Sequence, residues 1–192
     1  MNASRRIRRF KSRFRKSAGF TLIEAALTTV IVGTGVLAIV AAQQAYHMEN
    51  DWAQRTGTAL LLANELRELT LTLPIHDPIT GKSNLGPETG EGTVADYDDL
   101  DDFAGTVDAL GIGSGLSFNP PINALRQPVQ EMADWTQTIN VESVLPDDIS
   151  SAFTQSLGAD GTLKRVTVTV QYQGPNDNQA MSITSLTWVV TD

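Results

Sequence analysis

The chain has 192 residues, of which 41% are hydrophobic and 19% are charged, and its formal net charge at neutral pH is −8. This length suffices for one modest globular domain and a further segment, and hardly for two independent cores. The chain contains no cysteine, which excludes a disulfide framework, a thiolate nucleophile and a metal site with cysteine ligands.

The first 19 residues are strongly basic. They contain eight Lys and Arg residues and no acid, so subtracting these eight positive charges from the net charge of −8 leaves −16 for residues 20–192. A charge asymmetry this sharp usually reports targeting or membrane topology. We therefore interpret residues 1–19 as a basic leader that contacts anionic lipid headgroups. Its basic residues are Arg5, Arg6, Arg8, Arg9, Lys11, Arg13, Arg15 and Lys16.

Residues 20–42 form an apolar run of 23 residues in which Glu24 is the one ionisable group. At about 1.5 Å per residue, a helix of this length spans the hydrocarbon core of a bilayer, which is roughly 30 Å thick. Basic residues beside a membrane helix stay on the cytoplasmic side. The sequence therefore predicts a single-pass inner-membrane protein with a cytoplasmic N-terminus and an exported acidic head.

Two secretory signals offer alternative interpretations of this segment. A Sec signal peptide also joins a basic region to an apolar run, and residues 40–42 (Val-Ala-Ala) resemble its cleavage site. The apolar run is, however, longer than the roughly 7 to 15 residues of such peptides, and the helical pattern continues beyond it. Residues 4–6 (Ser-Arg-Arg) resemble a twin-arginine signal, but six further charges separate them from the apolar run. Both observations favour a membrane helix that is retained.

Glu24 is the unusual residue of the apolar run. A carboxylate near a helix end inside the bilayer costs roughly 2 to 3 kcal/mol, so it calls for a named partner or a reason to have none. One interpretation is that Glu24 lies shallow enough to reach the headgroups and has no role. The other is that a cation from a neighbouring molecule pairs with it.

The residues around Glu24 favour the second interpretation. They read Ala18-Gly19-Phe20-Thr21-Leu22-Ile23-Glu24 behind the basic leader. This stretch closely resembles the class III signal of type IV prepilins and of the pseudopilins of type II secretion systems. The resemblance implies that a prepilin peptidase cuts between Gly19 and Phe20 and methylates the new N-terminus at Phe20. It also implies that the partners are other pilin or pseudopilin subunits, bound through the N-terminal helix.

Physical chemistry makes a pairing role for Glu24 reasonable. Cleavage would create an α-amino group at Phe20 that is largely cationic at neutral pH. If two helices pack with a stagger of one subunit, this amine lies at the depth of the neighbour's Glu24. A subunit out of register would leave a buried charge unpaired, so Glu24 is the candidate residue for assembly and register.

Small residues along the apolar run would let helix backbones approach each other closely. Gly33 and Gly35 do not have GxxxG spacing, so local flexibility explains them as well as packing does. Many major pilins have a proline where this chain has Ala41, and we therefore do not expect the kink of that family here. The small residues are Ala25, Ala26, Gly33, Gly35, Ala38, Ala41 and Ala42.

Residues 43–73 continue the helix as an amphipathic segment that ends before Pro74. We expect its apolar stripe to pack in the core of the head, with contact to a partner helix as the alternative. Residues 63–69 resemble the helix of the minor subunits called PilV-type pilins or I-type pseudopilins. The stripe consists of Trp52, Ala59, Leu62, Leu66, Leu69 and Leu73.

Residues 74–128 are interrupted by Pro and Gly so often that we expect mainly surface loop. Clustered carboxylates in residues 96–103 suit Ca²⁺, although the spacing lacks the glycine and the terminal Glu of an EF-hand. We favour a solvated acidic loop anchored by Tyr97, Leu100 and Phe103, with no metal. The weak calcium candidates are Asp96, Asp98, Asp99, Asp101 and Asp102.

Residues 129–192 predict an antiparallel sheet. A first strand lies around residues 135–141, a short segment follows at 150–157, and strands cover 163–173 and 180–191. The parity of the apolar residues changes within the last strand, which suggests a bulge or a twist. Residues 163–170 again resemble PilV-type and I-type heads. Three strands packed on the amphipathic helix give an α+β fold of the type IV pilin kind, with residues 74–192 as the head.

Catalysis finds no support in the sequence. His47 and His76 lie far apart, and no P-loop, GxSxG, HExxH or dinucleotide-binding pattern occurs. We expect no cofactor, and the acidic head disfavours nucleic acid as a partner. The preferred interpretation is a minor pilin or pseudopilin, a structural subunit of a type IV pilus or a type II secretion pseudopilus. The alternative is a signal-anchored envelope protein whose exported head binds a ligand.

Overall fold

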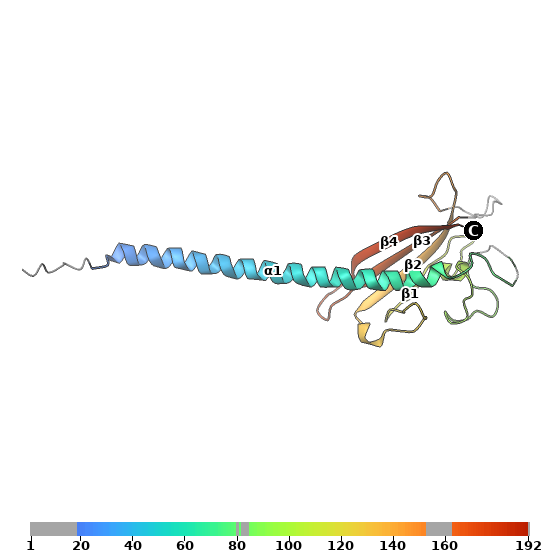
Figure 1. Cartoon of the computed structure of the whole chain (residues 1–192), viewed down its shortest axis with the longest axis horizontal. Coiled ribbons are helices and arrows are strands. Elements are labelled where there is room, and N and C mark those ends of the chain that lie inside the picture. Colours follow the sequence, from blue (N-terminus) through green and yellow to red (C-terminus); the bar gives the residue numbers. More distant parts are fainter. Residues whose placement is uncertain (1–18, 80, 82–84, 153–162, 192) are drawn as a thin grey trace, which may run out of the picture. The chain divides into compact units, whose positions relative to one another are not determined.

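The computed structural model describes residues 19–79, 81, 85–152 and 163–191, and the chain divides into two units, Met1–Met48 and Glu49–Asp192. Its longest element is helix α1, Leu22–Leu71, with 50 residues (Figure 1). The continuous helix predicted over residues 20–73 is therefore present, shorter by two residues at each end. The remaining residues of the basic leader, 1–18, lie outside the described part of the chain.

Helix α1 begins where Thr21 caps it. The Thr21 hydroxyl accepts a hydrogen bond from the backbone N–H of Glu24 at 3.3 Å, and the Thr21 carbonyl accepts one from the N–H of Ala25 at 3.1 Å. Thr followed three residues later by Glu is the pattern of a capping box. At the other end, the N–H of Leu73 bonds to the carbonyl of Thr70 in a tighter turn, just before Pro74. Both ends of the helix are thus encoded locally.

The first half of α1 exposes its apolar side chains. Residues 19–54 are all exposed within the chain. One window of α1 has a mean hydropathy of 2.2 and is not buried at all, so the helix is long and apolar enough to cross a membrane. The first unit accordingly has no core of its own among the described residues 19–48.

The second half of α1 buries one face in the head. The buried stripe is spaced three and four residues apart, as the sequence predicted for a core-facing helix. Leu73 packs partly buried against this core. Trp52 was also assigned to the stripe, and this is wrong: its side chain is 47% exposed. The stripe consists of Ala59, Leu62, Ala63, Leu66, Leu69 and Thr70.

The head contains a four-stranded antiparallel sheet in the order β1-β2-β3-β4 (Figure 1). The long strands are β2, Trp135–Val144, β3, Leu163–Tyr172, and β4, Met181–Thr191. On β3 the alternating Val166, Val168 and Val170 are fully buried and form its inward face. The segment expected at 150–157 forms no regular element at 150–152, and 153–157 lie outside the described residues.

The predicted irregularity in the last strand is a β-bulge. Val170 pairs with Thr184 and Gln171 pairs with Ser182, so Ile183 is the extra residue on β4. The extra residue shifts the side-chain parity by one. As a result, Ile183 packs against the core, although odd-numbered residues after the bulge, such as Thr187 and Val189, face outward.

Strand β1, Leu116–Phe118, lies in the segment predicted as loop, so the three-stranded sheet was one strand short. Its three residues pair with residues 137–139 of β2. Close backbone contacts position it: the N–H of Gly115 bonds to the carbonyl of Ala104 at 2.9 Å, and a Cβ on Gly105 would lie 2.7 Å from the carbonyl oxygen of Gly115. Glycine is therefore required where the acidic segment meets the sheet edge.

A polar side chain links the helix, the sheet and the loop. Gln137 of β2 is fully buried and donates to the carbonyls of Leu62 at 2.7 Å and Ile122 at 3.2 Å. Its own carbonyl oxygen accepts from the N–H of Ile122 at 2.8 Å. Because each polar atom of this amide has a partner, its burial is compatible with a stable core.

Candidate functional site

The residues assigned to proteolytic processing are accessible. Gly19 and Phe20 precede α1, both are exposed, and no atom lies within 4 Å of a Cβ built on Gly19. Phe20 itself is 71% exposed. The described residues therefore impose no steric requirement for glycine at position 19.

Glu24 lies in the first turn of α1 and is exposed. Its side chain forms no ion pair with any described residue. An acid at this position is favoured by the partial positive charge of a helix N-terminus. Glu24 thus has a local role as the third residue of the helix, while its charge has no cationic partner among the described residues.

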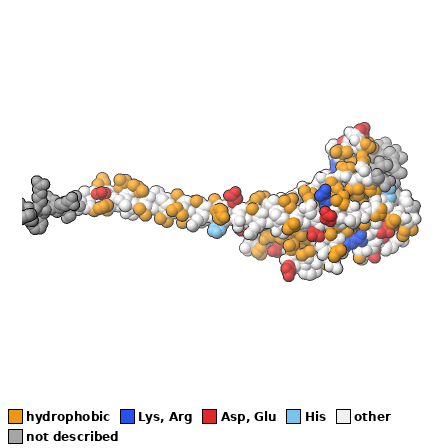
Figure 2. Space-filling view, in the orientation of Figure 1, with side chains coloured by type: hydrophobic (Ala, Val, Ile, Leu, Met, Phe, Trp, Pro, Cys, Tyr) orange, Lys and Arg blue, Asp and Glu red, His pale blue; other side chains and the backbone are white. Residues whose placement is uncertain are grey.

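Three threonine hydroxyls of the apolar run form hydrogen bonds within the helix. The hydroxyls of Thr28, Thr29 and Thr34 donate to carbonyls one turn earlier, at 2.7 to 3.0 Å. Such internal bonds remove the need for water around the hydroxyl groups. A Cβ on Gly33 or Gly35 would meet nothing within 4 Å. The chain itself therefore gives no packing reason for these two glycines. Figure 2 shows hydrophobic side chains along this part of α1.

The acidic segment of the head is buried, and the prediction of a solvated loop is wrong. Asp99, Asp101 and Asp102 are all 0% exposed. Tyr97, Leu100 and Phe103 do anchor the segment as predicted, since all three belong to the core. A short 3-10 helix, η1, covers Asp101–Ala104 and directs Phe103 inward while the acids lie on its other sides.

Asp101 has its own cation. Its carboxylate lies 3.1 Å from the ammonium group of Lys164 and 3.5 Å from Nδ1 of His76. Lys164 is only 1% exposed and also donates to the Ser143 hydroxyl at 3.1 Å. Burial raises the pKa of Asp101, and the neighbouring Lys164 and His76 act against that rise. His76 thus lies beside Asp101 rather than isolated in a loop, whereas His47 is exposed on α1.

The side chains of Asp99 and Asp102 accept hydrogen bonds from each other's backbone N–H groups. One oxygen of Asp102 accepts from the N–H groups of Asp98 at 3.0 Å and Asp99 at 3.3 Å, and one oxygen of Asp99 accepts from the N–H of Asp102 at 3.1 Å. Burial raises the pKa of Asp99 to about 8, with the charges of Asp102 and Asp101 adding to the effect. Burial and the interaction with Glu91 raise the pKa of Asp102 to about 7.

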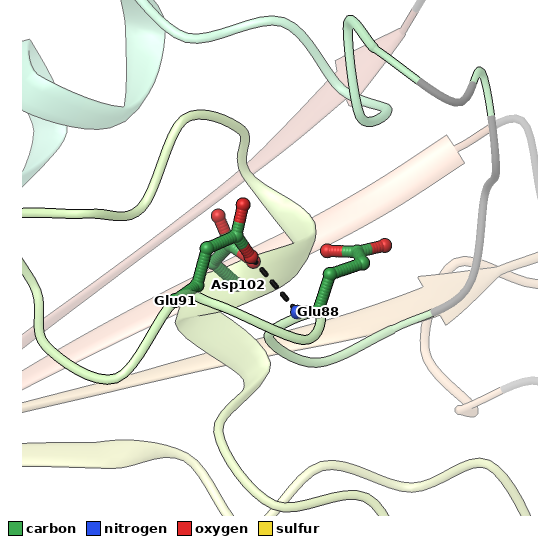
Figure 3. A group of neighbouring side chains, drawn as sticks. All are labelled: Glu88, Glu91 and Asp102. Atoms are coloured by element: carbon green, nitrogen blue, oxygen red, sulfur yellow. Dashed lines mark hydrogen bonds between the residues drawn. The ribbon is translucent and has the colours of Figure 1, made fainter.

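The structure adds two acids that sequence reasoning missed. Glu88 and Glu91 each bring a carboxylate oxygen within 4.8 Å of one another and of an oxygen of Asp102. Figure 3 shows these three side chains together. Glu91 is oriented by the N–H of Glu88, which donates to its carboxylate at 2.8 Å. Asp98 and Asp99 form a second such group with Asp102. Of the predicted calcium candidates, Asp98, Asp99 and Asp102 come together, while Asp96 is exposed beside Thr93 and Asp101 pairs with Lys164.

Comparisons with protein-family models, with curated proteins and with solved structures find no match for this chain.

Proposed function

We propose that this chain is a minor pilin or pseudopilin, a structural subunit of a type IV pilus or a type II secretion pseudopilus. In this proposal a prepilin peptidase cuts the precursor after Gly19 and methylates Phe20. The observation that carries the proposal is the contiguous run from Gly19 to Glu24, placed between a basic leader and a long apolar helix with a single acid. The chain is structural and not catalytic.

The proposed location is the inner membrane before assembly. The apolar half of α1 spans the bilayer, the basic leader keeps the N-terminus in the cytoplasm, and the head of residues 74–192 is exported. The exposed apolar side chains of residues 22–42 support this, because in water they would present a large unfavourable surface. The internally bonded hydroxyls of Thr28, Thr29 and Thr34 also suit a medium without water.

In the filament, the partner of Glu24 is the N-terminal amine of a neighbouring subunit. Cleavage supplies a cation four residues before the acid, and neighbouring subunits bring the two charges to one depth. An exposed carboxylate with no ion-pair partner among the described residues supports this role. The open space at Gly33 and Gly35 supports close approach of another helix, since the chain's own packing does not require glycine there.

The first experiment determines the mature N-terminus. The full chain is expressed with a prepilin peptidase, and its N-terminal peptide is analysed by mass spectrometry. We expect N-methylated Phe20, and we expect Gly19→Leu to leave the leader attached because a side chain there crowds the scissile bond. Gly33→Leu is the matched control, with the same substitution away from the cut, and should be processed normally. An intact Met1 or a start near Gln43 would instead identify a signal-anchored or Sec-cleaved envelope protein.

The second experiment separates the charge of Glu24 from its role in the helix cap. Glu24→Gln removes the charge but retains a residue that suits the third helical position. We expect it to be cleaved and to lose at least about tenfold in incorporation into sheared fibres, since one desolvated charge pair disappears. Thr21→Val is the control that removes the capping hydroxyl and keeps the charge, and it should incorporate. Equal incorporation of Glu24→Gln and the wild type would contradict the pairing role of Glu24.

A further inference from the structure

We propose that the carboxylates of Glu88, Glu91, Asp98, Asp99 and Asp102 form a Ca²⁺ site in the head that binds one ion, with Asp102 as the common ligand. The proposed filament role does not require this site, and the site does not require the filament role. The two proposals therefore fail separately.

The geometry fits a calcium ion. Ca²⁺ takes six to eight oxygen ligands at about 2.3 to 2.6 Å, so oxygens on opposite sides of one ion lie about 4.6 to 5.2 Å apart. One oxygen each from Glu88, Glu91 and Asp102 lies within 4.8 Å of the other two, and the same is true of one oxygen each from Asp98, Asp99 and Asp102. Figure 3 shows the first of these two groups. Three oxygens at this spacing can contact one ion.

Unpartnered buried oxygens provide independent evidence for a ligand. Asp99 and Asp102 are 0% exposed, and each has one oxygen held by backbone N–H groups. The second oxygen of each, Oδ2 of Asp99 and Oδ1 of Asp102, is buried and accepts no hydrogen bond from any described residue. The same is true of Oε2 of Glu88 and Oδ1 of Asp98. A buried polar atom left unpaired costs roughly 1 to 3 kcal/mol, and more when it is charged. Within the described residues, four such oxygens in one cluster are available as ligands for a cation.

Among the described residues, the two cations nearest this cluster have other partners. Lys164 pairs with Asp101. Arg126 donates through Nη1 to the carbonyls of residues 94, 95 and 97. Its charge lowers the pKa of Asp98, but this effect is smaller than the opposing effects of burial and of Glu91 and Asp77.

The donor set selects the ion. All ligands are carboxylate oxygens, which suit hard cations and not the softer metals that prefer Cys or His. Mg²⁺ demands near-ideal octahedral geometry and retains its waters, whereas Ca²⁺ accepts irregular carboxylate arrangements. An irregular cluster contributed by two loop segments and the start of η1 therefore favours Ca²⁺.

The test is calorimetric titration of Ca²⁺ into the full chain in detergent, after treatment with a chelator. We expect one site with a Kd below about 1 mM, in the range of extracellular calcium modules. Asp102→Asn should weaken binding at least about tenfold, and Glu91→Gln and Asp98→Asn, one from each group of three carboxylates, should each weaken it as well. Asp96→Asn, an exposed acid of the same loop, is the matched control and should bind like the wild type.

Stability measurements separate a metal site from a purely structural carboxylate. Without Ca²⁺, Asp102→Asn should melt at a higher temperature than the wild type, because it removes one of several crowded buried charges. With Ca²⁺, only the wild type and Asp96→Asn should gain stability. If Asp102→Asn does not fold, Glu91→Gln and Asp98→Asn carry the test. The proposal is overturned by the absence of binding at about 10 mM Ca²⁺, by an equal response to Mg²⁺, or by unchanged binding in all three cluster variants.

Discussion

The two units of this chain expose and bury opposite kinds of side chain. In residues 19–48 every side chain is exposed although the segment is mainly apolar, while the head buries four aspartates and a lysine beside its aliphatic core. Apolar side chains without a core depend on lipid or on other subunits, and buried charges depend on counter-charges. Asp101 has its counter-charge in Lys164, whereas Glu24 and the cluster around Asp102 have none among the described residues. We therefore propose partners from outside the chain for the acids that have no cation within the described part of it. These partners are the amine of a neighbouring subunit for Glu24 and Ca²⁺ for the cluster around Asp102.

The largest expected effect follows from breaking the internal pair. Lys164→Met should destabilise the head by about 3 to 5 kcal/mol, because it leaves the buried Asp101 without its main cation. Denaturant unfolding of the full chain in detergent measures the loss. Replacing both partners, as Lys164→Met with Asp101→Leu, should recover most of it. The control is Arg165→Met, which removes the more exposed ion pair with Glu142 and should cost about 1 kcal/mol or less. Equal effects of Lys164→Met and Arg165→Met would contradict the comparison.

A matched pair within one helix tests the two units directly. Leu66 is 0% exposed and Leu37 is 70% exposed, although both lie in α1. Leu66→Ala should lower the free energy of unfolding by about 2 to 5 kcal/mol, since it opens a cavity in the core. Leu37→Ala should leave the unfolding of the head unchanged and weaken only membrane insertion. A comparable loss from both substitutions would show that residues 22–42 also contribute to the core of the head.

Elements with a regular pattern were predictable from the sequence. The helical spacing from Ala59 to Leu69 and the alternation along β3 each indicate one face, and the structure buries those faces. Strand β1 has only three residues, too few to show a period, and its pairing depends on β2. Trp52 has the right spacing, yet the buried stripe of α1 begins only at Ala59.

The acidic segment was misjudged because its counter-charge is distant in sequence. A run of aspartates is expected to be exposed to solvent unless a cation is known to face it. Lys164 lies on β3, far from the aspartates in the sequence, so its position beside Asp101 was not apparent. One feature did point to it: Lys164 has the same parity on β3 as Val166 and Val168, so an inward-facing lysine was already implied. Glu88 and Glu91 come from a loop without a pattern, and only the folded backbone brings them to Asp102. The local periodicity of a sequence gives no information on which distant segments contact each other.

The stability of the head should depend on pH, with an effect of intermediate size, because the acids around Asp102 have no cation among the described residues while Asp101 has Lys164. The folded-state pKa is about 8 for Asp99 and about 7 for Asp102, against an ordinary value of 3.8, so the unfolded chain releases these protons first. Without Ca²⁺, stability should therefore be full near pH 4 and fall as the pH rises through about 7 to 8. The charged and titratable groups around this pair are Glu88, Glu91, Asp77, Asp98, Asp101, Lys164, His76, Arg126 and Tyr97.

Thermal unfolding in the presence of a chelator measures this effect. The melting temperature at about pH 8.5 should lie several degrees below that at about pH 5.5. The Asp102→Asn variant should show a smaller decrease, because one of the two titrating groups is gone. Asp148, whose pKa is lowered by hydrogen bonds from Ser150 and Ser151, changes ionisation only below this range and does not contribute. A melting temperature that rises across the same range would contradict the burial of these acids.

The smallest effect concerns two glycines of α1 that differ only in their surroundings. A Cβ on Gly57, in the head unit, or on Gly33, in the apolar run, would meet nothing within 4 Å. Gly57→Ala should therefore stabilise the head by about 0.8 to 1 kcal/mol, the difference in helix propensity between the two residues. Gly33→Ala should leave the unfolding of the head unchanged and should reduce incorporation into fibres if another helix packs there. Normal incorporation of Gly33→Ala would mean that Gly33 serves no contact between subunits, which would restrict the proposed assembly surface to the region of Glu24.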